Sequence, residues 1–214
     1  MGVFFRRHLP HIHVPGATYF ITFRLAGSLP GEVLMRVQEA YQAYLRRLEC
    51  ALSGSAMQAE RYRAQKRYFA HLDALLDQVR YGPRWLAQKE CAQIVATCIR
   101  ELAPTHYRLH AFCIMPNHVH MLIDQQGVSE PALRVHGRIY TALSRAMRLL
   151  KGKSAALCNR YLGRRGPFWQ HESYDHLVRD EKEYERILAY IIINPIRAGL
   201  GPDWEQWPYT YVAE

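Results

Sequence analysis

Apolar positions recur along this chain with two different periods, which separate predicted strands from predicted helices. The run TYFITFRL at 18–25 is rich in β-branched and aromatic residues and lies between two glycines, which is typical of a strand. At 32–52 the apolar residues recur at spacings of three and four, which predicts an amphipathic helix. A Ser-Gly-Ser break at 53–55 precedes a charged, helix-prone stretch, and another helix is predicted at about 86–102.

Two extended runs, YRLHAFCI and HVHMLI, flank a short Met-Pro-Asn connection, so 107–123 is predicted to form a β-hairpin or a bulged strand. Because side chains alternate along a strand, His118 and His120 share one face with Leu122. Buried imidazoles need hydrogen bonds or a metal ion. The residues alone leave two interpretations open, a hydrogen-bonded pair or a pair of metal ligands.

The last predicted helix begins near Asp180, and Pro195 should end it or loosen its last turn. Tyr190 and Asn194 are four residues apart, so they lie on one helical face. The default interpretation is a core tyrosine with a satisfied hydroxyl and a turn asparagine before proline. The same spacing would also place a nucleophilic hydroxyl beside an amide oxygen that could complete a cation site.

Together these elements predict an α+β fold in a single domain that covers residues 1–214. A small antiparallel sheet carries the histidine pair, and helices pack on one side of it, including the C-terminal helix with Tyr190. We interpret the stretch around 53–80 as a helical insertion with no assigned role. A basic segment around 131–171 is expected to flank the site.

Composition adds a charge argument to this pattern. Lys and Arg total 28 against 19 Asp and Glu, a formal net charge of +9 over 214 residues. Such an excess favours a polyanionic partner, with nucleic acid first and an anionic membrane surface second. No run approaches the roughly 20 apolar residues that span a bilayer, and the start lacks the apolar core of a signal peptide. The five cysteines form no CxxC pair, so we expect reduced thiols in a cytoplasmic protein.

The basic segment at 131–171 contains no Asp or Glu, and its first part is predicted to be helical with arginines along one side. A solvated basic face usually mixes both signs, so a single sign interrupted by aromatic residues favours phosphate contacts. The candidate DNA-binding residues are Arg134, Arg138, Arg145, Arg148, Lys151, Lys153, Arg164 and Arg165. Trp169 is expected to brace the last helix rather than to stack on a base.

Three motifs in this order, MPNHVHMLI, GPFWQHESYDHLVRD and YIIINPIRAGL, closely resemble those of the single-tyrosine HUH transposases. Within that family the chain is most similar to the REP-associated tyrosine transposases. HUH stands for histidine, bulky hydrophobe, histidine, which His118-Val119-His120 matches. The resemblance runs from about Gly16 to the WPYTY near the C-terminus, whereas the stretch at 53–79 matches nothing in it.

The resemblance implies a set of site residues. Tyr190 matches the nucleophile of the family, and Tyr184 is its competitor six residues earlier, on roughly the opposite face of the helix. His118, His120 and Asn194 match the metal ligands, although many relatives carry the longer Gln where Asn194 stands. The metal is expected to be Mg²⁺ or Mn²⁺, and Zn²⁺ also suits imidazole ligands.

The resemblance also implies an activity, a metal-dependent endonuclease and strand transferase that acts on single-stranded DNA near hairpins. A covalent 5′-phosphotyrosine intermediate would keep the energy of the broken bond, so rejoining needs no nucleotide cofactor. The alternative is a binding protein of the same ancestry that recognises structured DNA or RNA without cutting it. A metal-binding protein unrelated to DNA is disfavoured by the acid-free basic segment. No membrane partner is expected, and both a monomer and a homodimer that shares active sites stay open.

Overall fold

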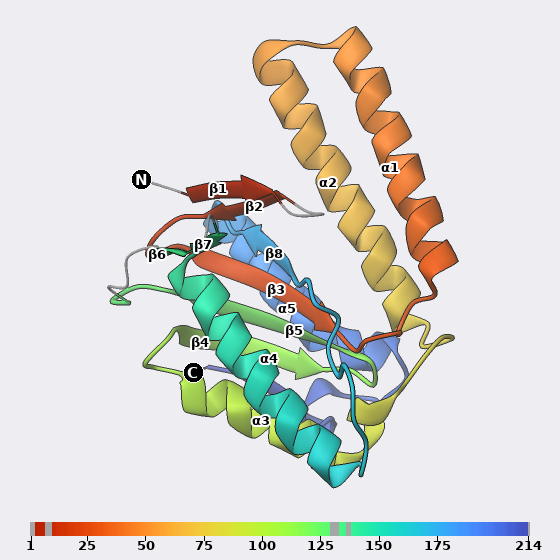
Figure 1. Cartoon of the computed structure of the whole chain (residues 1–214), viewed down its shortest axis with the longest axis vertical. Helices are drawn as coiled ribbons and strands as arrows, with labels where there is room; N and C mark the ends of the chain where they lie inside the picture. The colour runs from red at the N-terminus through yellow and green to blue at the C-terminus, as the bar shows by residue number, and fades with distance from the viewer. Residues whose placement is uncertain (1–2, 7–9, 129–132, 136–137, 214) are drawn as a thin grey trace.

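An antiparallel sheet of five strands forms the centre of the computed structural model, which describes residues 3–6, 10–128, 133–135 and 138–213 (Figure 1). The strand order is β8-β3-β5-β4-β9, with bounds β3 (Thr18–Arg24), β4 (Arg108–Ile114), β5 (His118–Asp124), β8 (Tyr174–Leu177) and β9 (Thr210–Val212). Helices and antiparallel strands together confirm the predicted α+β class.

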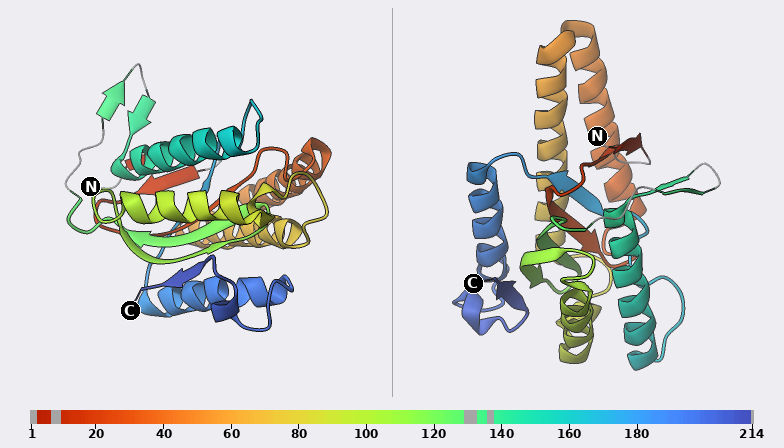
Figure 2. Two further views of the ribbon diagram at one scale, coloured as in Figure 1. Left: turned by 90° about the horizontal axis from the view of Figure 1, so that it is seen from below. Right: turned by 90° about the vertical axis from the view of Figure 1, so that its left-hand side faces the viewer.

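Helices cover both faces of this sheet (Figure 2). α3 (Lys89–Leu102) and α4 (Ala142–Tyr161) lie on one face, and α5 (Glu181–Arg197) lies on the other. Val119 and Met121 of β5 pack in the core beneath α3 and α4, whereas Leu122 packs with Ile191 of α5. The expectation that helices pack on one side only is wrong. Every residue of β5 is buried, so both faces of the sheet need a cover.

The predicted hairpin is formed by β4 and β5 around the connection at 115–117, with a bulge between Leu109 and Ala111. β5 is the central strand and pairs with both β3 and β4 along its length. His118 and His120 stand at the start of this strand and face α5. The strand predictions at 18–25 and 107–123 are therefore confirmed.

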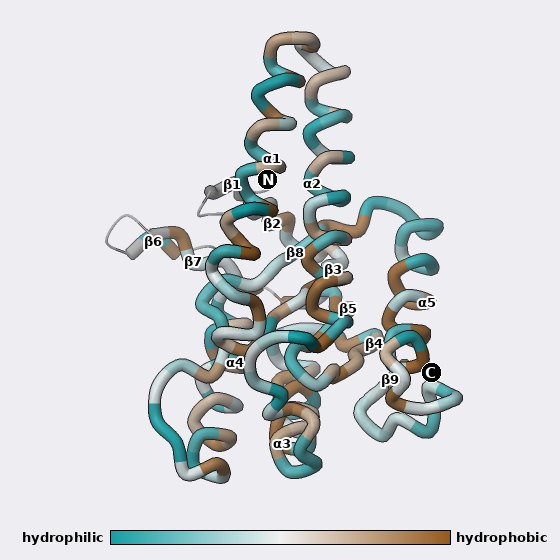
Figure 3. The backbone as a smooth tube through the Cα atoms, turned by 90° about the vertical axis from the view of Figure 1, so that its right-hand side faces the viewer, coloured by the Kyte–Doolittle hydropathy of each residue, from teal (hydrophilic) through white to brown (hydrophobic). Residues whose placement is uncertain are grey.

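Two long antiparallel helices, α1 (Gly31–Ala51) and α2 (Gly54–Asp77), project from the sheet and are called here the α1–α2 arm (Figure 1). Figure 3 shows hydrophilic and hydrophobic residues mixed along this arm. The C-terminal half of α2 is anchored to the sheet. Phe69 and Leu76 are buried, and Asn117 donates a side-chain hydrogen bond of 3.1 Å to the Leu76 carbonyl. The C-terminal end of α2 is therefore part of the main fold.

The start of the basic segment is not helical, contrary to the prediction. β6 (Leu133–Val135) and β7 (Arg138–Tyr140) pair as a two-stranded ribbon, and α4 begins only at Ala142. β-branched and aromatic residues favour extended backbone here. Thr141 then caps α4, because its side chain accepts a hydrogen bond of 3.2 Å from the Ser144 amide.

The remaining elements are short, namely β1 (Val3–Arg6), β2 (Pro10–His13) and the 3₁₀ turns η1 (Trp85–Ala87) and η2 (Trp204–Gln206). α5 begins after Asp180, whose side chain accepts a hydrogen bond from the Glu183 amide, and Pro195 lies in its last turn. Within the described ranges, no helix combines the length and the apolar character needed to cross a membrane.

Candidate active site

The two histidines of β5 are fully buried, and their Nε2 atoms lie 2.9 Å apart. Nδ1 of His118 lies 2.7 Å from Oδ1 of Asn117, and Nδ1 of His120 lies 2.9 Å from the hydroxyl of Thr22. The amide nitrogen of Asn117 donates to Leu76, so its Oδ1 must be the acceptor for His118. The proton of His118 therefore sits on Nδ1, which leaves an Nε2 lone pair directed at its neighbour.

The outer hydrogen bonds prepare both rings for a shared ligand. The 2.9 Å contact between the two Nε2 atoms is a hydrogen bond when Nε2 of His120 carries the proton and its Nδ1 accepts from the Thr22 hydroxyl. It leaves two opposed lone pairs when Nδ1 of His120 carries the proton and donates to Thr22. Burial, and next the neighbouring His118, hold the pKa of His120 well below its usual value, so protonation is disfavoured. A metal ion accepts lone pairs from neutral imidazoles held in this way.

Two carboxylates of α2 join the histidines, although no role was predicted for this helix. Oδ1 of Asp77 lies 3.4 Å from Nε2 of His118. Asp77, His118 and His120 place one donor atom each within 4.8 Å of one another, the sole His, Cys, Asp or Glu group of this kind among the residues described. Asp73 lies one helical turn before Asp77. The four-residue spacing of these two carboxylates is visible in the sequence. The sequence does not indicate which part of the fold this face of the helix packs against.

Asn194 supports the metal interpretation, because its side chain is fully buried and neither Oδ1 nor Nδ2 finds a hydrogen-bond partner in the described part of the chain. Oδ1 of Asp77 likewise lacks a hydrogen bond there. Orphaned buried oxygens are costly unless a ligand satisfies them. Two imidazoles, a carboxylate and an amide fit a divalent cation, and this donor set suits Mg²⁺, Mn²⁺ and Zn²⁺.

Tyr190 of α5 lies beside the histidines of the same chain. Its ring meets that of His120 edge-on, with centroids 5.3 Å apart, and its hydroxyl donates to Oδ2 of Asp73 at 3.4 Å. Burial, followed by the carboxylates of Asp73 and Asp77, raises the pKa of Tyr190 well above its usual value. Burial and the nearby Asp77 raise the pKa of Asp73 to about 8. The phenol is therefore neutral and needs help to lose its proton.

The competing tyrosine lies elsewhere. The ring of Tyr184 meets His110 edge-on at 5.4 Å, and His110 contacts Asp124 through Nε2 and Oδ2 at 2.7 Å. Asp124 ends β5, whereas His118 begins it, so the two lie about 20 Å apart along the strand. Of the two tyrosines, Tyr190 is the one beside the histidine pair.

A cleft of about 410 Å³ opens between α2 and α5 next to Tyr190. Its aromatic lining comes from Phe20, Phe69 and Tyr174, and its cationic lining comes from Lys66, Arg186 and Arg197. Arg186 and Arg197 are exposed to solvent. Tyr190 therefore lines a cleft in which cationic side chains stand beside the acidic ones of Asp73, Asp77 and Glu183.

A buried network around Glu183 of α5 holds the arm in place. Glu183 forms an ion pair with Lys66 of α2 and accepts a hydrogen bond of 3.2 Å from the hydroxyl of Tyr62. Its carboxylate also lies 3.1 Å from Nε2 of His176 and accepts the amide hydrogen of Arg179. Burial would raise the pKa of Glu183, but Lys66, the Arg179 amide and His176 together lower it to about 2.

We expect Glu183→Gln to lower the free energy of unfolding at pH 7 by about 1–3 kcal/mol, since it removes a charged hydrogen-bond acceptor. The folded pKa of about 2 lies below the ordinary 4.5, so this contribution is present above pH 4.5 and is lost toward pH 2. Urea unfolding at pH 7 and pH 3 should show the gap to the unaltered chain narrowing at pH 3. Glu185→Gln, exposed on the same helix, should have an effect below about 0.5 kcal/mol. A gap that stays constant with pH would contradict the role of the charge.

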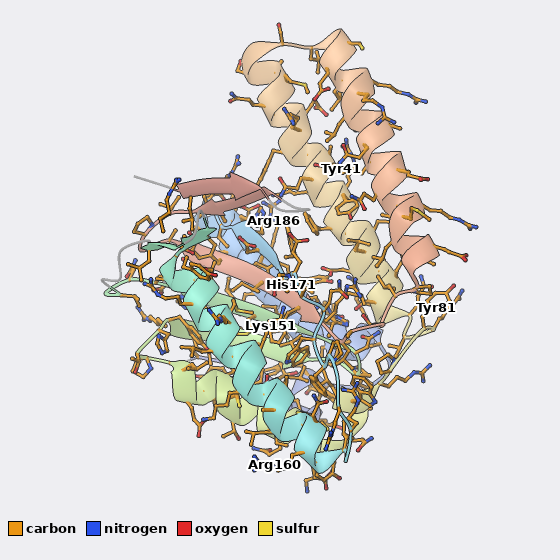
Figure 4. The ribbon with its side chains drawn as sticks, viewed as in Figure 1. Tyr41, Tyr81, Lys151, Arg160, His171 and Arg186 are labelled. Atoms are coloured by element: carbon orange, nitrogen blue, oxygen red, sulfur yellow. The ribbon has the colours of Figure 1, made fainter. Side chains whose placement is uncertain are left out.

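The predicted DNA-binding residues on α4 lie on the face of the sheet opposite Tyr190 (Figure 2). Lys151 donates to the carbonyls of Gln170 and His171 at 2.7 and 2.9 Å, which ties down the loop after α4 (Figure 4). Lys153 forms an ion pair of 2.6 Å with Glu101. These two lysines therefore have structural partners.

The other members of that set differ in exposure. The guanidinium of Arg164 lies 3.9 Å from the ring centroid of Trp85, and that of Arg145 donates to the Tyr140 carbonyl at 3.4 Å. Besides Lys153, three arginines of the set are exposed, namely Arg134, Arg148 and Arg165. The side chain of Arg138 lies outside the described residues. As a DNA-binding surface the set stays a prediction.

Trp169 does not brace α5, contrary to the prediction. It packs edge-on against Phe23, with ring centroids 4.8 Å apart, and its Nε1 donates to the hydroxyl of Ser154 on α4 at 3.0 Å. Both contacts lie in the core beneath α3 and α4. Trp169 therefore supports the face of the sheet that is remote from Tyr190.

Comparison with known proteins adds independent findings. A family model described as "Transposase IS200 like" matches residues 80–194, more than half of the chain. A Haemophilus influenzae protein named as a REP-associated tyrosine transposase is 31% identical over 101 residues, which cover 47% of this chain and 56% of that protein. An uncharacterized protein of the same organism is 34% identical over 114 residues, 46% of this chain and 57% of its own length. The chain thus spans little more than half the length of these relatives.

One solved structure is also similar, that of a REP-associated tyrosine transposase bound to a REP hairpin. Its TM-score is 0.45 at 16% sequence identity. The alignment covers 96% of this chain and 80% of that one.

Proposed function

This chain belongs to the family of IS200-like transposases, and from that premise we propose that it cuts and rejoins single-stranded DNA next to hairpins through a covalent bond to Tyr190. One observation carries the proposal: the phenol of Tyr190 lies beside the paired Nε2 atoms of His118 and His120 within one chain. A curated relative named as a REP-associated tyrosine transposase supports the tyrosine chemistry.

The residues that would hold a divalent cation are His118, His120, Asn194 and Asp77. When bound, such a cation neutralises charge on the scissile phosphate and polarises a non-bridging oxygen. Charge balance supports its presence, because the carboxylate of Asp77 would otherwise repel a polyanion that enters the cleft. Asn117 and Thr22 keep the imidazoles oriented through their outer nitrogens.

Tyr190 is the nucleophile of the proposed reaction. Its oxygen attacks phosphorus, a 5′-phosphotyrosine forms, and the 3′-hydroxyl of the cut strand is released. α5 positions the phenol, and the ring contacts with His120 and Phe20 restrict its rotation. Positioning of this kind removes entropy from the barrier before the reaction begins. Attack of the 3′-hydroxyl on the phosphotyrosine reverses the step, so rejoining needs no nucleotide cofactor.

The DNA backbone would cross the cleft, with Arg186 and Arg197 on phosphates near the scissile bond. The part of the basic segment on α4 would hold DNA farther from Tyr190, on the other face of the sheet (Figure 2). Residues that only bind DNA and residues that also act in cleavage would then lie on opposite faces of the sheet. Cations of the cleft should affect both steps, and those of α4 should affect binding alone.

We expect Arg186→Gln/Arg197→Gln to weaken DNA binding and to lower the cleavage rate at saturating protein at least about tenfold, since charge next to the reacting phosphate is lost. Arg148→Gln/Arg165→Gln is the matched double variant on the opposite face. It should make the log–log salt slope of binding shallower by about 1.4, using about 0.7 per contact, with the saturated rate unchanged. Fluorescence anisotropy across 50–200 mM NaCl and single-turnover cleavage measure the two quantities. A saturated rate that falls equally in both variants would contradict this division.

The deciding experiment uses a fluorescent single-stranded oligonucleotide that carries a DNA hairpin, incubated with the protein and Mg²⁺ or Mn²⁺. A denaturing gel should show a protein-linked band and a shortened free strand. Binding without any cleaved or protein-linked product would favour the non-cleaving DNA-binding alternative.

A further inference from the structure

The α1–α2 arm brings a buried carboxylate to the reacting hydroxyl. Oδ2 of Asp73 accepts the hydrogen bond of Tyr190 at 3.4 Å, although the two residues are 117 positions apart. The Asp73 side chain is 9% exposed and lines the cleft that leads to the phenol. It forms no ion pair with any described residue. Among the described residues, the one hydrogen-bond partner of this buried carboxylate is the phenol of Tyr190, and such a pairing calls for a chemical role.

Other proton acceptors near Tyr190 are already committed. The Nδ1 atoms of His118 and His120 are held by Asn117 and Thr22, and their Nε2 atoms face each other. Those Nε2 atoms and Oδ1 of Asp77 are also donors of the candidate metal site. A neutral phenol is a weak nucleophile, so it needs a base within hydrogen-bond reach. Asp73 lies within that reach, and it meets the requirement in its ionised form, whose share grows as pH rises through its pKa of about 8.

We propose that Asp73 is the catalytic base that takes the proton of Tyr190 during strand cleavage, a role that rests on the proposed function. The Tyr190 oxygen forms a bond to phosphorus as its proton passes to Oδ2 of Asp73. The bond from phosphorus to the 3′-oxygen breaks, and that oxygen keeps the bonding pair and takes a proton from water. Asp73 then releases its proton to solvent, so no oxidant or reductant takes part.

Two features of the fold support this role. The anchors at Lys66–Glu183 and at Asn117–Leu76 fix α2 on either side of Asp73. The 3.4 Å separation is long for a hydrogen bond, as is common for catalytic pairs without substrate, which tighten when the substrate binds. The arm, which lies in no motif shared with the family, would thus complete the active site.

The test begins with a hairpin oligonucleotide that the unaltered chain cleaves and Tyr190→Phe does not, which establishes the proposed function separately. Asp73→Asn keeps the shape of the side chain but cannot accept the proton. Its single-turnover cleavage should fall about 10²–10³-fold, with DNA affinity and Mn²⁺ affinity within about twofold of the unaltered chain. Glu49→Gln, which removes an exposed carboxylate from the same arm, should leave the rate unchanged.

A chemical rescue separates a base from a structural residue. Replacing Tyr190 with 3,5-difluorotyrosine makes the phenol more acidic and so less dependent on a base. In the Asp73→Asn background this replacement should restore the rate at least about tenfold, and it should change the rate little when Asp73 is present. Asp73→Ser, which is smaller and also lacks a carboxylate, should be rescued in the same way if Asp73→Asn folds poorly. Loss without rescue in both variants, or no loss at all, would overturn the proposal.

Discussion

Tyr190→Phe is expected to abolish the covalent protein–DNA band and to lower strand cleavage by at least about 10⁴-fold, because the oxygen that attacks phosphorus is absent. DNA binding should stay within about twofold. The ring contacts of Tyr190 with His120 and Phe20 do not involve the hydroxyl, so the α5 helix keeps its place. The measurement is a denaturing gel with labelled hairpin oligonucleotide, beside anisotropy for binding.

The matched control is Tyr184→Phe on the same helix. Tyr184 contacts His110 at the far end of β5, so its loss should leave the adduct intact. An adduct that persists in Tyr190→Phe and disappears in Tyr184→Phe would move the nucleophile to Tyr184. An adduct that survives in both would place the nucleophile outside α5.

His118→Ala is expected to weaken Mn²⁺ binding at least about 100-fold and to remove cleavage, because two opposed Nε2 donors become one. Calorimetric titration with MnCl₂ measures the affinity directly, independent of activity. EDTA should stop cleavage by the unaltered chain, and excess Mg²⁺ or Mn²⁺ should restore it.

His71→Ala is the control for this variant, since His71 is exposed on α2 and lies outside the candidate donor set. Its Mn²⁺ affinity and cleavage rate should match those of the unaltered chain. Full cleavage in EDTA would refute the metal requirement. Unchanged Mn²⁺ affinity in His118→Ala would place the ion elsewhere.

The predictions that held depend on local periodicity. A strand has a period of two, so placing HVHMLI in a strand was enough to put His118 and His120 on one face. A helix brings residues four apart together, which put Tyr190 and Asn194 on one face of α5. Both inferences need only the geometry of a single element. Two of the three family motifs lie on these elements. The predicted family is confirmed by the matching family model.

What the sequence missed or predicted wrongly depended on what packs against each element. Asp73 and Asp77 share a helical face, as Tyr190 and Asn194 do. Only the packing of α2 beside α5 and β5 shows that this face contacts the histidines and the phenol. The basic segment is interpreted from its charge and its interleaved aromatic residues, and Leu133–Val135 forms a strand where the sequence predicts a helix. Charge constrains which face meets solvent, but it does not choose secondary structure or the side of the sheet.

The sequence by itself determined the α+β class, the paired imidazoles, and the tyrosine and asparagine one helical turn apart, because backbone geometry links neighbours of fixed spacing. Only the tertiary structure decided which of these meet. It placed Tyr190 beside His120, brought two carboxylates from the α1–α2 arm to the same site, and put α4 on the opposite face. Such contacts join residues more than 40 positions apart, and the burial of both faces of β5, rather than any local pattern, selects them.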